Sequence, residues 1–407
     1  MRLSAGVIIL ADGTLLRDVT LTVIDGVITD IASGVDIDAV FYSVVTPLFH
    51  NGHSHIEYQL LSGILPPGPF FPWIRDVVRM KFCLPKALWA LSSFYGVNKL
   101  LEMGYASTED CSDSGFAAFM MFSCGLRGTS YREVNGLVSD IDSICCESRI
   151  DDLHRCLGKM PVGIAPHAVY STCQAVMDVV LSRAHGLPVC IHVDESPEED
   201  QFCRSNAGPF VEMFSNRNIE YNSPNSSAIM HFDRLGLVSQ NTLLVHGCNW
   251  SPDDIAVVKA RESRVSVCPE SNQFLQCKRP PVDLMYQSGI PLVIGTDSAL
   301  SCPSMSPTKQ LLLLMDRESD PNFHKWVFHS QVTAESGQPY DIQVKGGADF
   351  CAFGRGESVS GKTLHDIIRQ IAVVIPDVFR SGNRMDYGQC QGRRDDLIRV
   401  VRELANH

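Results

Sequence analysis

Short apolar runs separated by tight turns open the chain, at residues 7–10, 20–24 and 27–31. Asp-Gly pairs follow the first two runs at Asp12 and Asp25, and Asp-Gly between alternating apolar residues is typical of a β-hairpin. So few strands cannot bury a core of their own, and residues that favour strands become frequent again towards the end of the chain. We therefore expect residues 1–45 and 338–385 to combine into one small β-sandwich domain.

From about residue 46 the pattern becomes a repeat of apolar strand, loop and helix. The strands are expected at residues 44–55, 105–110, 128–133, 161–167, 188–192, 242–246, 264–267 and 291–296. Apolar residues at helical spacing follow most of them, for example at residues 88–103, 116–124, 140–157 and 172–185. Eight buried strands alternating with helices predict an α/β fold, a (β/α)8 TIM barrel over residues 46–337. A last amphipathic run predicts a C-terminal helix within residues 386–407.

Composition and charge limit the partners of the chain. It has 407 residues, of which 45% are hydrophobic and 20% charged, and this fits a globular protein with a large core. The net charge of −12 argues against a nucleic-acid backbone or an anionic membrane as the main partner. No apolar run approaches the roughly 20 residues of a membrane span. The 15 cysteines are scattered without a Cys-x-x-Cys pair, which favours a reduced, cytoplasmic protein.

Ionisable residues stand at the C-terminal ends of five of the predicted strands, where a TIM barrel carries its active site. They are His53 and His55 on the first strand, His167 on the fourth, His192 on the fifth, His246 on the sixth and Asp297 on the eighth. A buried structural histidine or a helix cap explains any one of them well, but not the whole set. Histidine and aspartate offer nitrogen and oxygen ligands suited to Zn2+ or Fe2+, and such an ion lowers the pKa of bound water to about 7.

Five motifs follow one another in an order and spacing that resemble the amidohydrolase superfamily, in its metal-dependent deaminase branch. They are His53-Ser-His55, His192-Val-Asp-Glu195, His246, Cys268-Pro-Glu-Ser-Asn272 and Gly295-Thr-Asp-Ser298. The resemblance implies one divalent metal ion, Zn2+ or Fe2+, held by His53, His55, His192 and Asp297. It also implies that His246 and Asp297 orient and deprotonate the attacking water and that Glu195 shuttles protons. Two-metal members carry a bridging lysine where His167 stands here, so one ion is favoured.

The substrate is less constrained by these motifs. Glu57, the Pro-rich loop 63–72 and the segment 192–199 resemble the aminodeoxyfutalosine deaminases. That resemblance implies the conversion of 6-amino-6-deoxyfutalosine into futalosine and ammonia, a step of menaquinone biosynthesis. The residues expected to bind substrate are His167, Glu57, Trp73, Arg75, Arg79 and Ser298.

Two of these assignments have an equally good structural explanation. The benzoate of the implied substrate calls for a cation, and Arg75 or Arg79 would supply it, although a solvated helix face also accounts for both. Trp73 can stack on an aromatic ring or pack against the barrel rim.

Two further hypotheses remain. The same reaction can act on an adenosine-type or S-adenosylhomocysteine-type nucleoside, guanine or cytosine, and turnover of each compound separates these substrates. A non-catalytic scaffold protein would have lost metal ligands, whereas all of them are present here, and metal analysis decides that alternative. Asp194 and Lys309-Gln310 depart from the family pattern, which bears on the substrate and not on the reaction class. Homodimers are common among similar proteins, so the resemblance is compatible with one.

Overall fold

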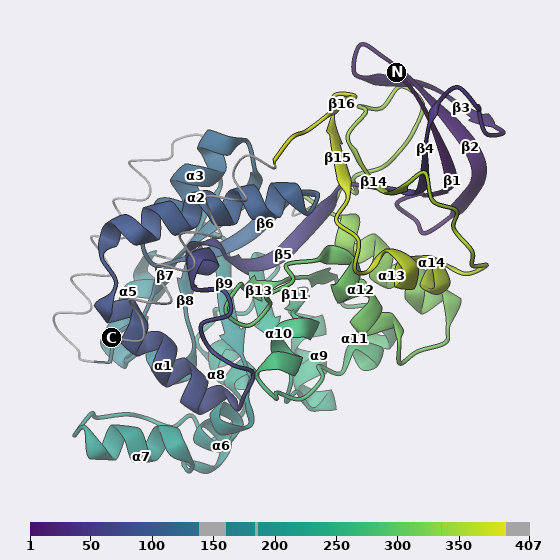
Figure 1. The fold of residues 1–407 in the computed structure, drawn as a ribbon. Helices are drawn as coiled ribbons and strands as arrows, with labels where there is room; N and C mark the ends of the chain where they lie inside the picture. Colours follow the sequence, from purple (N-terminus) through teal and green to yellow (C-terminus); the bar gives the residue numbers. More distant parts are fainter. Residues whose placement is uncertain (138–159, 184–185, 335, 388–407) are drawn as a thin grey trace.

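The computed structural model describes residues 1–137, 160–183, 186–334 and 336–387, which form two sheets with helices around the larger one (Figure 1). In this part of the chain the smaller sheet has seven strands in the order β16-β15-β14-β4-β1-β2-β3. The larger has nine, in the order β12-β11-β10-β9-β8-β7-β6-β5-β13. The predicted helices at residues 140–157 and within 388–407 lie outside the described residues.

The larger sheet closes into the predicted barrel. Its parallel strands are β5 (Phe49–His55), β6 (Tyr105–Ser112), β7 (Arg127–Val134), β8 (Val162–Pro166), β9 (Val189–Val193), β10 (Thr242–His246), β11 (Arg264–Val267), β12 (Leu292–Ile294) and β13 (Asp297–Ser298). β12 pairs with β11, and β13 pairs with β5. Only two residues separate β12 from β13, so together they act as one interrupted eighth strand that joins the two sides of the ring. The predicted fold class is confirmed.

The first predicted barrel strand is in fact two strands. β4 (Val40–Pro47) belongs to the smaller sheet, where it pairs with β1 (Arg2–Ile9) and β14 (Phe350–Arg355). The chain then passes at Leu48 into β5 of the barrel. Pro47 has no amide hydrogen to continue a ladder, which favours a break here. Both segments are buried and apolar, so hydrophobic periodicity alone does not reveal the boundary.

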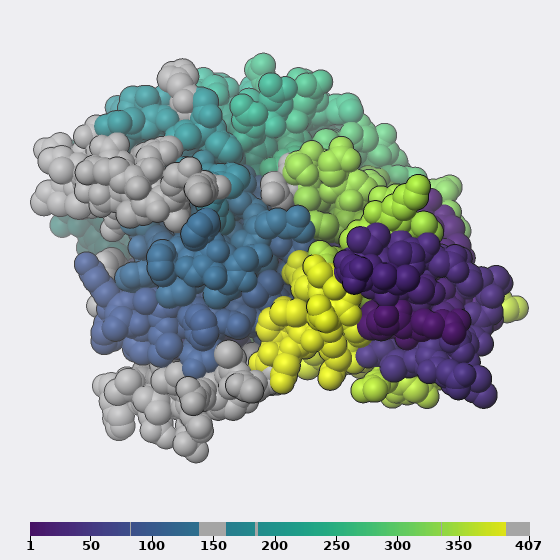
Figure 2. All heavy atoms as spheres, turned by 90° about the horizontal axis from the view of Figure 1, so that it is seen from above, coloured from purple at the N-terminus to yellow at the C-terminus, as the bar shows by residue number. Residues whose placement is uncertain are grey.

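The small domain combines strands from both ends of the chain, which lie side by side in Figure 2 (purple and yellow). Its remaining strands are β2 (Leu15–Ile24), β3 (Val27–Ser33), β15 (Asp377–Arg380) and β16 (Asn383–Arg384). Asp25 and Gly26 both have positive φ, at 50° and 77°, as a two-residue hairpin turn requires, so the hairpin predicted there is confirmed. Hydrogen bonds join all seven strands into one continuous sheet, which buries a hydrophobic cluster separate from the barrel core.

The described helices surround the barrel. They are η1 (Ile56–Leu61), α1 (Phe70–Cys83), α2 (Lys86–Glu102), α3 (Phe116–Cys124), η2 (Val169–Ser171), α5 (Gln174–Arg183), α6 (Pro197–Ser205), α7 (Pro209–Asn216), α8 (Ala228–Arg234), α9 (Pro252–Ala260), α10 (Pro269–Phe274), α11 (Val282–Ser288), α12 (Pro307–Met315), α13 (Pro321–Val332) and α14 (Leu364–Ile371). Three of them begin alike, because Ser196, Ser251 and Ser306 each cap a helix whose first residue is proline.

Helix α14 lies in the segment that the sequence predicts to be β-rich. Thr363 and Asp366 form a capping box at its start, and its apolar residues recur at helical spacing. No helix within the described residues is both long enough and apolar enough to cross a membrane.

Candidate active site

Four of the predicted metal ligands meet at the C-terminal mouth of the barrel. The Nε2 atom of His192 lies 3.2 Å from Nε2 of His55 and 3.1 Å from Nε2 of His53. One carboxylate oxygen of Asp297 lies 3.6 Å from Nε2 of His53 and 3.5 Å from Nε2 of His55. All four side chains are buried. The strands β5, β9 and β13 therefore bring three ring nitrogens and one oxygen to a common point.

This donor set fits a divalent cation. A neutral imidazole carries one N–H, and three Nε2 atoms that converge this closely cannot all be satisfied by one another. Burial lowers the pKa of His55 to about 4 and that of His192 well below its usual value, which keeps both rings in the neutral, ligating form. Three nitrogens and a carboxylate oxygen match the coordination preferences of Zn2+ and of Fe2+.

His53 and Asp297 titrate differently from the other ligands. Burial would lower the pKa of His53, but the nearby Asp297 carboxylate and Cys190 thiol raise it to about 10. Burial would raise the pKa of Asp297, but the neighbouring His53 and His55 rings hold it well below its usual value. Each side chain thus favours the charged form of the other, and a bound cation would take the place of the His53 proton.

Glu195 and His246 stand beside this cluster. Oε1 of Glu195 lies 3.5 Å from Nε2 of His246, and both residues are buried. Burial is the main cause that raises the pKa of Glu195 well above its usual value, and Asp297 adds to it. Burial also lowers the pKa of His246 to about 4. The pair therefore offers a carboxylic acid and a neutral imidazole next to the proposed ligands.

Residues that the sequence prediction left without a role hold these groups in place. Nδ1 of His246 lies 2.9 Å from Oδ1 of Asn272. The second oxygen of Asp297 accepts hydrogen bonds from Ser271 at 2.6 Å and Ser301 at 2.8 Å. Asn272 and Ser271 belong to the Cys-Pro-Glu-Ser-Asn motif, which was the available signal for them.

The backbone at these strand ends is strained. His246 has φ of 77° and Asp297 has φ of 63°, both in the left-handed region that residues with a Cβ rarely adopt. Such conformations persist where surrounding contacts impose them, and they are concentrated at functional sites. They help to turn the two side chains over the mouth of the barrel.

His167 and Trp73 lie along one wall of the site. The ring of His167 packs 4.7 Å from that of His192, and its Nδ1 lies 2.8 Å from the hydroxyl of Ser171. An aromatic chain continues outwards from His167 through Tyr170 to Phe70 and Trp73, with ring separations between 5.9 and 6.5 Å. Within the described residues the buried Nε1–H of Trp73 has no hydrogen-bond partner.

Glu57, a predicted substrate contact, accepts hydrogen bonds from the end of β6 and the loop that follows it. Its two carboxylate oxygens accept hydrogen bonds from Ser112, from the amides of Asp113 and Ser114, and from the hydroxyl of Ser114. The carboxylate is thereby used to hold the loop after β6. Ser298 is buried beside Asp297, with its hydroxyl 3.2 Å from that of Ser301.

Arg75 and Arg79 are not brought to the cluster. Their side chains are 45% and 68% exposed, and both guanidinium groups pair with Asp76 on the same helix. The geometry therefore does not support the prediction that they bind a substrate carboxylate at the barrel mouth.

Lys81 is the cation of α1 that points inwards. Its Nζ lies 2.9 Å from Asp113 and 3.6 Å from Glu133, and Glu133 in turn lies 3.7 Å from Nδ1 of His55. Trp73, Val77 and Lys81 are spaced four residues apart, so they share one helix face. The sequence prediction left Lys81 without a role.

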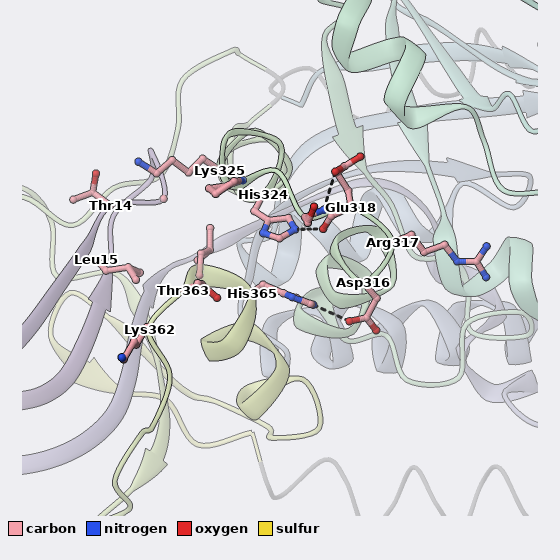
Figure 3. Close-up of a pocket in the computed structure, with 14 residues that line it drawn as sticks. Thr14, Leu15, Asp316, Arg317, Glu318, His324, Lys325, Lys362, Thr363 and His365 are labelled. Atoms are coloured by element: carbon pink, nitrogen blue, oxygen red, sulfur yellow. Dashed lines mark hydrogen bonds and ion pairs between the residues drawn. The ribbon is translucent and has the colours of Figure 1, made fainter.

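A separate cavity of about 800 Å3 opens between the small domain and the α12, α13 and α14 helices (Figure 3). Its histidines are engaged locally, since His365 pairs with Asp316 at 2.7 Å and His324 lies 2.7 Å from the carbonyl oxygen of Glu318. The cavity shares no residue with the histidine cluster, so we place the candidate active site at the barrel mouth.

The fold and the site together define a class of protein. The profile of the Amidohydrolase family matches residues 44–322, more than half of the chain. The chain therefore belongs to the amidohydrolase family and is a hydrolase.

Two relatives that are similar in sequence are deaminases. The aminodeoxyfutalosine deaminase of Deinococcus radiodurans is 26% identical over 290 residues, which are 66% of this chain and 67% of that protein. A 5-methylthioadenosine/S-adenosylhomocysteine deaminase of Nitratidesulfovibrio vulgaris is 25% identical over 327 residues, 77% of this chain and 68% of the relative.

Solved structures share the fold. Helicobacter pylori aminofutalosine deaminase in complex with methylthio-coformycin superposes with a TM-score of 0.75 at 19% identity, covering 95% of this chain and all of that one. An adenosine deaminase from Xanthomonas campestris with bound zinc gives a TM-score of 0.71 at 16% identity, covering 99% of this chain and 98% of the other.

Proposed function

We propose that this protein is a metal-dependent hydrolytic deaminase whose substrate is 6-amino-6-deoxyfutalosine, giving futalosine and ammonia. The observation that carries the reaction class is the convergence of three histidine Nε2 atoms and Asp297 beside the buried Glu195, whose pKa burial raises. A ligand set and a proton donor within one buried site are what hydrolytic removal of an amino group from a heterocycle requires.

Each residue of the site has a separate role in the proposed reaction. His53, His55, His192 and Asp297 would hold one divalent ion, Zn2+ or Fe2+. When bound, that ion would lower the pKa of water towards neutrality. His246 and Asp297 orient the attacking water, and Asp297 accepts its proton. Glu195 donates its proton to the ring nitrogen next to the carbon under attack. Asp297 then passes the proton taken from water to the amino group, which leaves as ammonia, and the remaining hydroxyl proton returns to Glu195 as the carbonyl of the product forms.

The walls of the site suit an aromatic substrate. Neither His167 nor Trp73 has a part in the catalytic steps above, and each can donate a hydrogen bond to a substrate. Both lie on the aromatic wall that begins at His192. We propose that His167 and Trp73 contact the nucleoside and that Ser298 supports it from the strand end. Similarity to the Deinococcus enzyme supports the choice of 6-amino-6-deoxyfutalosine, and with it a role in menaquinone biosynthesis.

A second candidate keeps the reaction and changes the substrate. Relatives that deaminate 5-methylthioadenosine or S-adenosylhomocysteine are similar to a comparable degree. In this alternative the aromatic wall contacts the thioether side of the nucleoside instead of a benzoate.

Product analysis separates the two candidates. We expect zinc-loaded protein to convert 6-amino-6-deoxyfutalosine into the hypoxanthine product with a kcat/KM at least about tenfold above those for adenosine, 5-methylthioadenosine, S-adenosylhomocysteine and guanine. Preference for one of the other compounds would replace the substrate and leave the reaction class intact. Stoichiometric metal binding with no turnover of any aminated ring would reject the proposed reaction.

A further inference from the structure

One ring nitrogen of His53 lacks the partner that a metal-ligating histidine normally has. Nε2 of His53 faces His192 and Asp297 at 3.1 and 3.6 Å. Nδ1 on the other side of the ring is buried and has no hydrogen-bond partner among the described residues. A buried polar atom without a partner is costly, so the groups packed against this nitrogen are of interest.

Two thiols lie against that ring. Cys111 and Cys190 are completely buried, and their Sγ atoms are 3.4 Å apart. One ring nitrogen of His53 and the two sulfurs all lie within 4.8 Å of one another, and the Cys111 thiol donates to the Cys190 sulfur. Because Nε2 already faces the other ligands, Nδ1 is the nitrogen left for the thiol pair.

Strand geometry places the thiol pair directly beneath the candidate metal site. Cys190 and His192 are alternate residues of β9 and therefore point to the same side of the strand. Cys190 thus lies one layer below the ligand His192, within a cluster of buried residues inside the barrel. Cys111 reaches the same layer from β6, while the other neighbours in this cluster are mostly apolar.

We infer that Cys190 is a positioning residue for the ligand His53, with its sulfur as the acceptor for Nδ1–H, and that the Cys111 thiol donates to the same sulfur. A hydrogen bond at Nδ1 fixes the tautomer in which Nε2 is free to bind a cation, and it also fixes the rotation of the ring. Histidine ligands usually donate this proton to a carboxylate or a backbone carbonyl, and loss of such a partner typically costs 10–100-fold in metal affinity. Here sulfur takes that place.

The inference rests on the proposed metal site. It is tested by the affinity of the protein for Zn2+. We expect Cys190→Ala to weaken Zn2+ binding about tenfold in a chelator competition, and Cys190→Ser to retain most of the affinity because a hydroxyl can also accept. Cys111→Ala should have a smaller effect of about threefold. Cys268→Ala is the matched control, since Cys268 is a buried thiol of the same cluster. It should bind Zn2+ within about twofold of the unaltered protein.

Spectroscopy separates positioning from general packing. In the Co2+-loaded protein, Cys190→Ala should alter the visible absorption bands, whereas Cys268→Ala should not. Equal effects of the two substitutions, or no effect of Cys190→Ala, would overturn the inference. If Cys190→Ala does not fold, the Zn2+ affinities of Cys190→Ser and Cys111→Ala are compared instead. Weaker Zn2+ binding by Cys190→Ser than by Cys111→Ala would contradict the inference. Tight metal binding without deamination would reject the proposed function alone, and a wild-type chain that binds no divalent ion would reject both.

Discussion

At the scale of single residues, burial assigns different tasks to groups of the same kind. Glu195 and Glu57 are both buried carboxylates of the barrel mouth. The two oxygens of Glu57 accept four hydrogen bonds from one loop, whereas Glu195 faces His246 and burial raises its pKa. Glu57 thus holds a loop, whereas Glu195 is placed for the proton transfer that we propose, a distinction that residue type and spacing alone do not reveal.

Glu195→Gln tests the proton donor. Glutamine keeps the shape but cannot transfer the proton, so kcat should fall by about 10^3-fold while one equivalent of metal stays bound. Activity would be followed by ammonia release and metal content by elemental analysis. Asp297→Ala is the contrasting variant, because it should lose both activity and part of the metal. Turnover of Glu195→Gln close to that of the unaltered enzyme would remove Glu195 from the mechanism.

At the scale of elements, the sequence predicts which residues stand at the end of a strand. It does not predict which side chains of distant elements contact them. The histidines of β5, β9 and β10 follow apolar runs, and barrel topology brings such strand ends together. The supporting Ser271 and Ser301 and the inward-facing Lys81 depend on neighbours far away in the sequence, so periodicity could not assign them. Helix α14 did carry a helical signal, which the β-branched residues around it obscured.

Helix α1 supplies a test of the substrate assignment. Since Arg75 and Arg79 are exposed and paired with Asp76, the double substitution Arg75→Ala/Arg79→Ala should change KM less than about twofold for 6-amino-6-deoxyfutalosine and for adenosine. Steady-state kinetics with both substrates checks this. A rise in KM restricted to the benzoate nucleoside would show that the arginines do bind its carboxylate, as the sequence alone suggested.

Lys81→Met tests the inward-facing cation of the same helix, in contrast to the two exposed arginines. It removes the cation that lies 3.6 Å from Glu133, next to His55. We expect a loss of about 2 kcal/mol in the free energy of unfolding, because removing one member of a largely buried pair leaves uncompensated charge. Urea denaturation measures it, and stability equal to that of Arg75→Ala/Arg79→Ala would contradict the buried role of Lys81.

At the scale of the whole molecule, a buried charge network ties distant strands of the barrel together. Arg264 of β11 binds Glu109 of β6 through both of its terminal nitrogens, at 2.6 and 2.9 Å, and Tyr131 donates to the same carboxylate at 2.7 Å. The alternation of strands and helices was enough to predict the barrel, but this cross-barrel network was not visible in the sequence. It lies inside the ring and away from the catalytic strand ends.

Glu109→Gln tests that network through pH. Burial alone would raise the pKa of Glu109, but the charge of Arg264 and contact with His50 lower it to about 2. A carboxylate whose pKa is lower in the folded state stabilises the fold above its unfolded pKa of about 4.5 and loses that contribution as pH falls towards 2. The variant should therefore be about 3 kcal/mol less stable at pH 7, and the difference should shrink below pH 4.5. A difference that is constant with pH would contradict the ionised pair.

The most direct test of the account is a metal titration of activity. Protein stripped with a chelator and mixed with 6-amino-6-deoxyfutalosine should release no ammonia, and added Zn2+ should restore release linearly until one equivalent per chain is bound. That result would establish one-ion hydrolytic deamination at the barrel mouth. Full activity of the stripped protein, or a requirement for two equivalents, would contradict it.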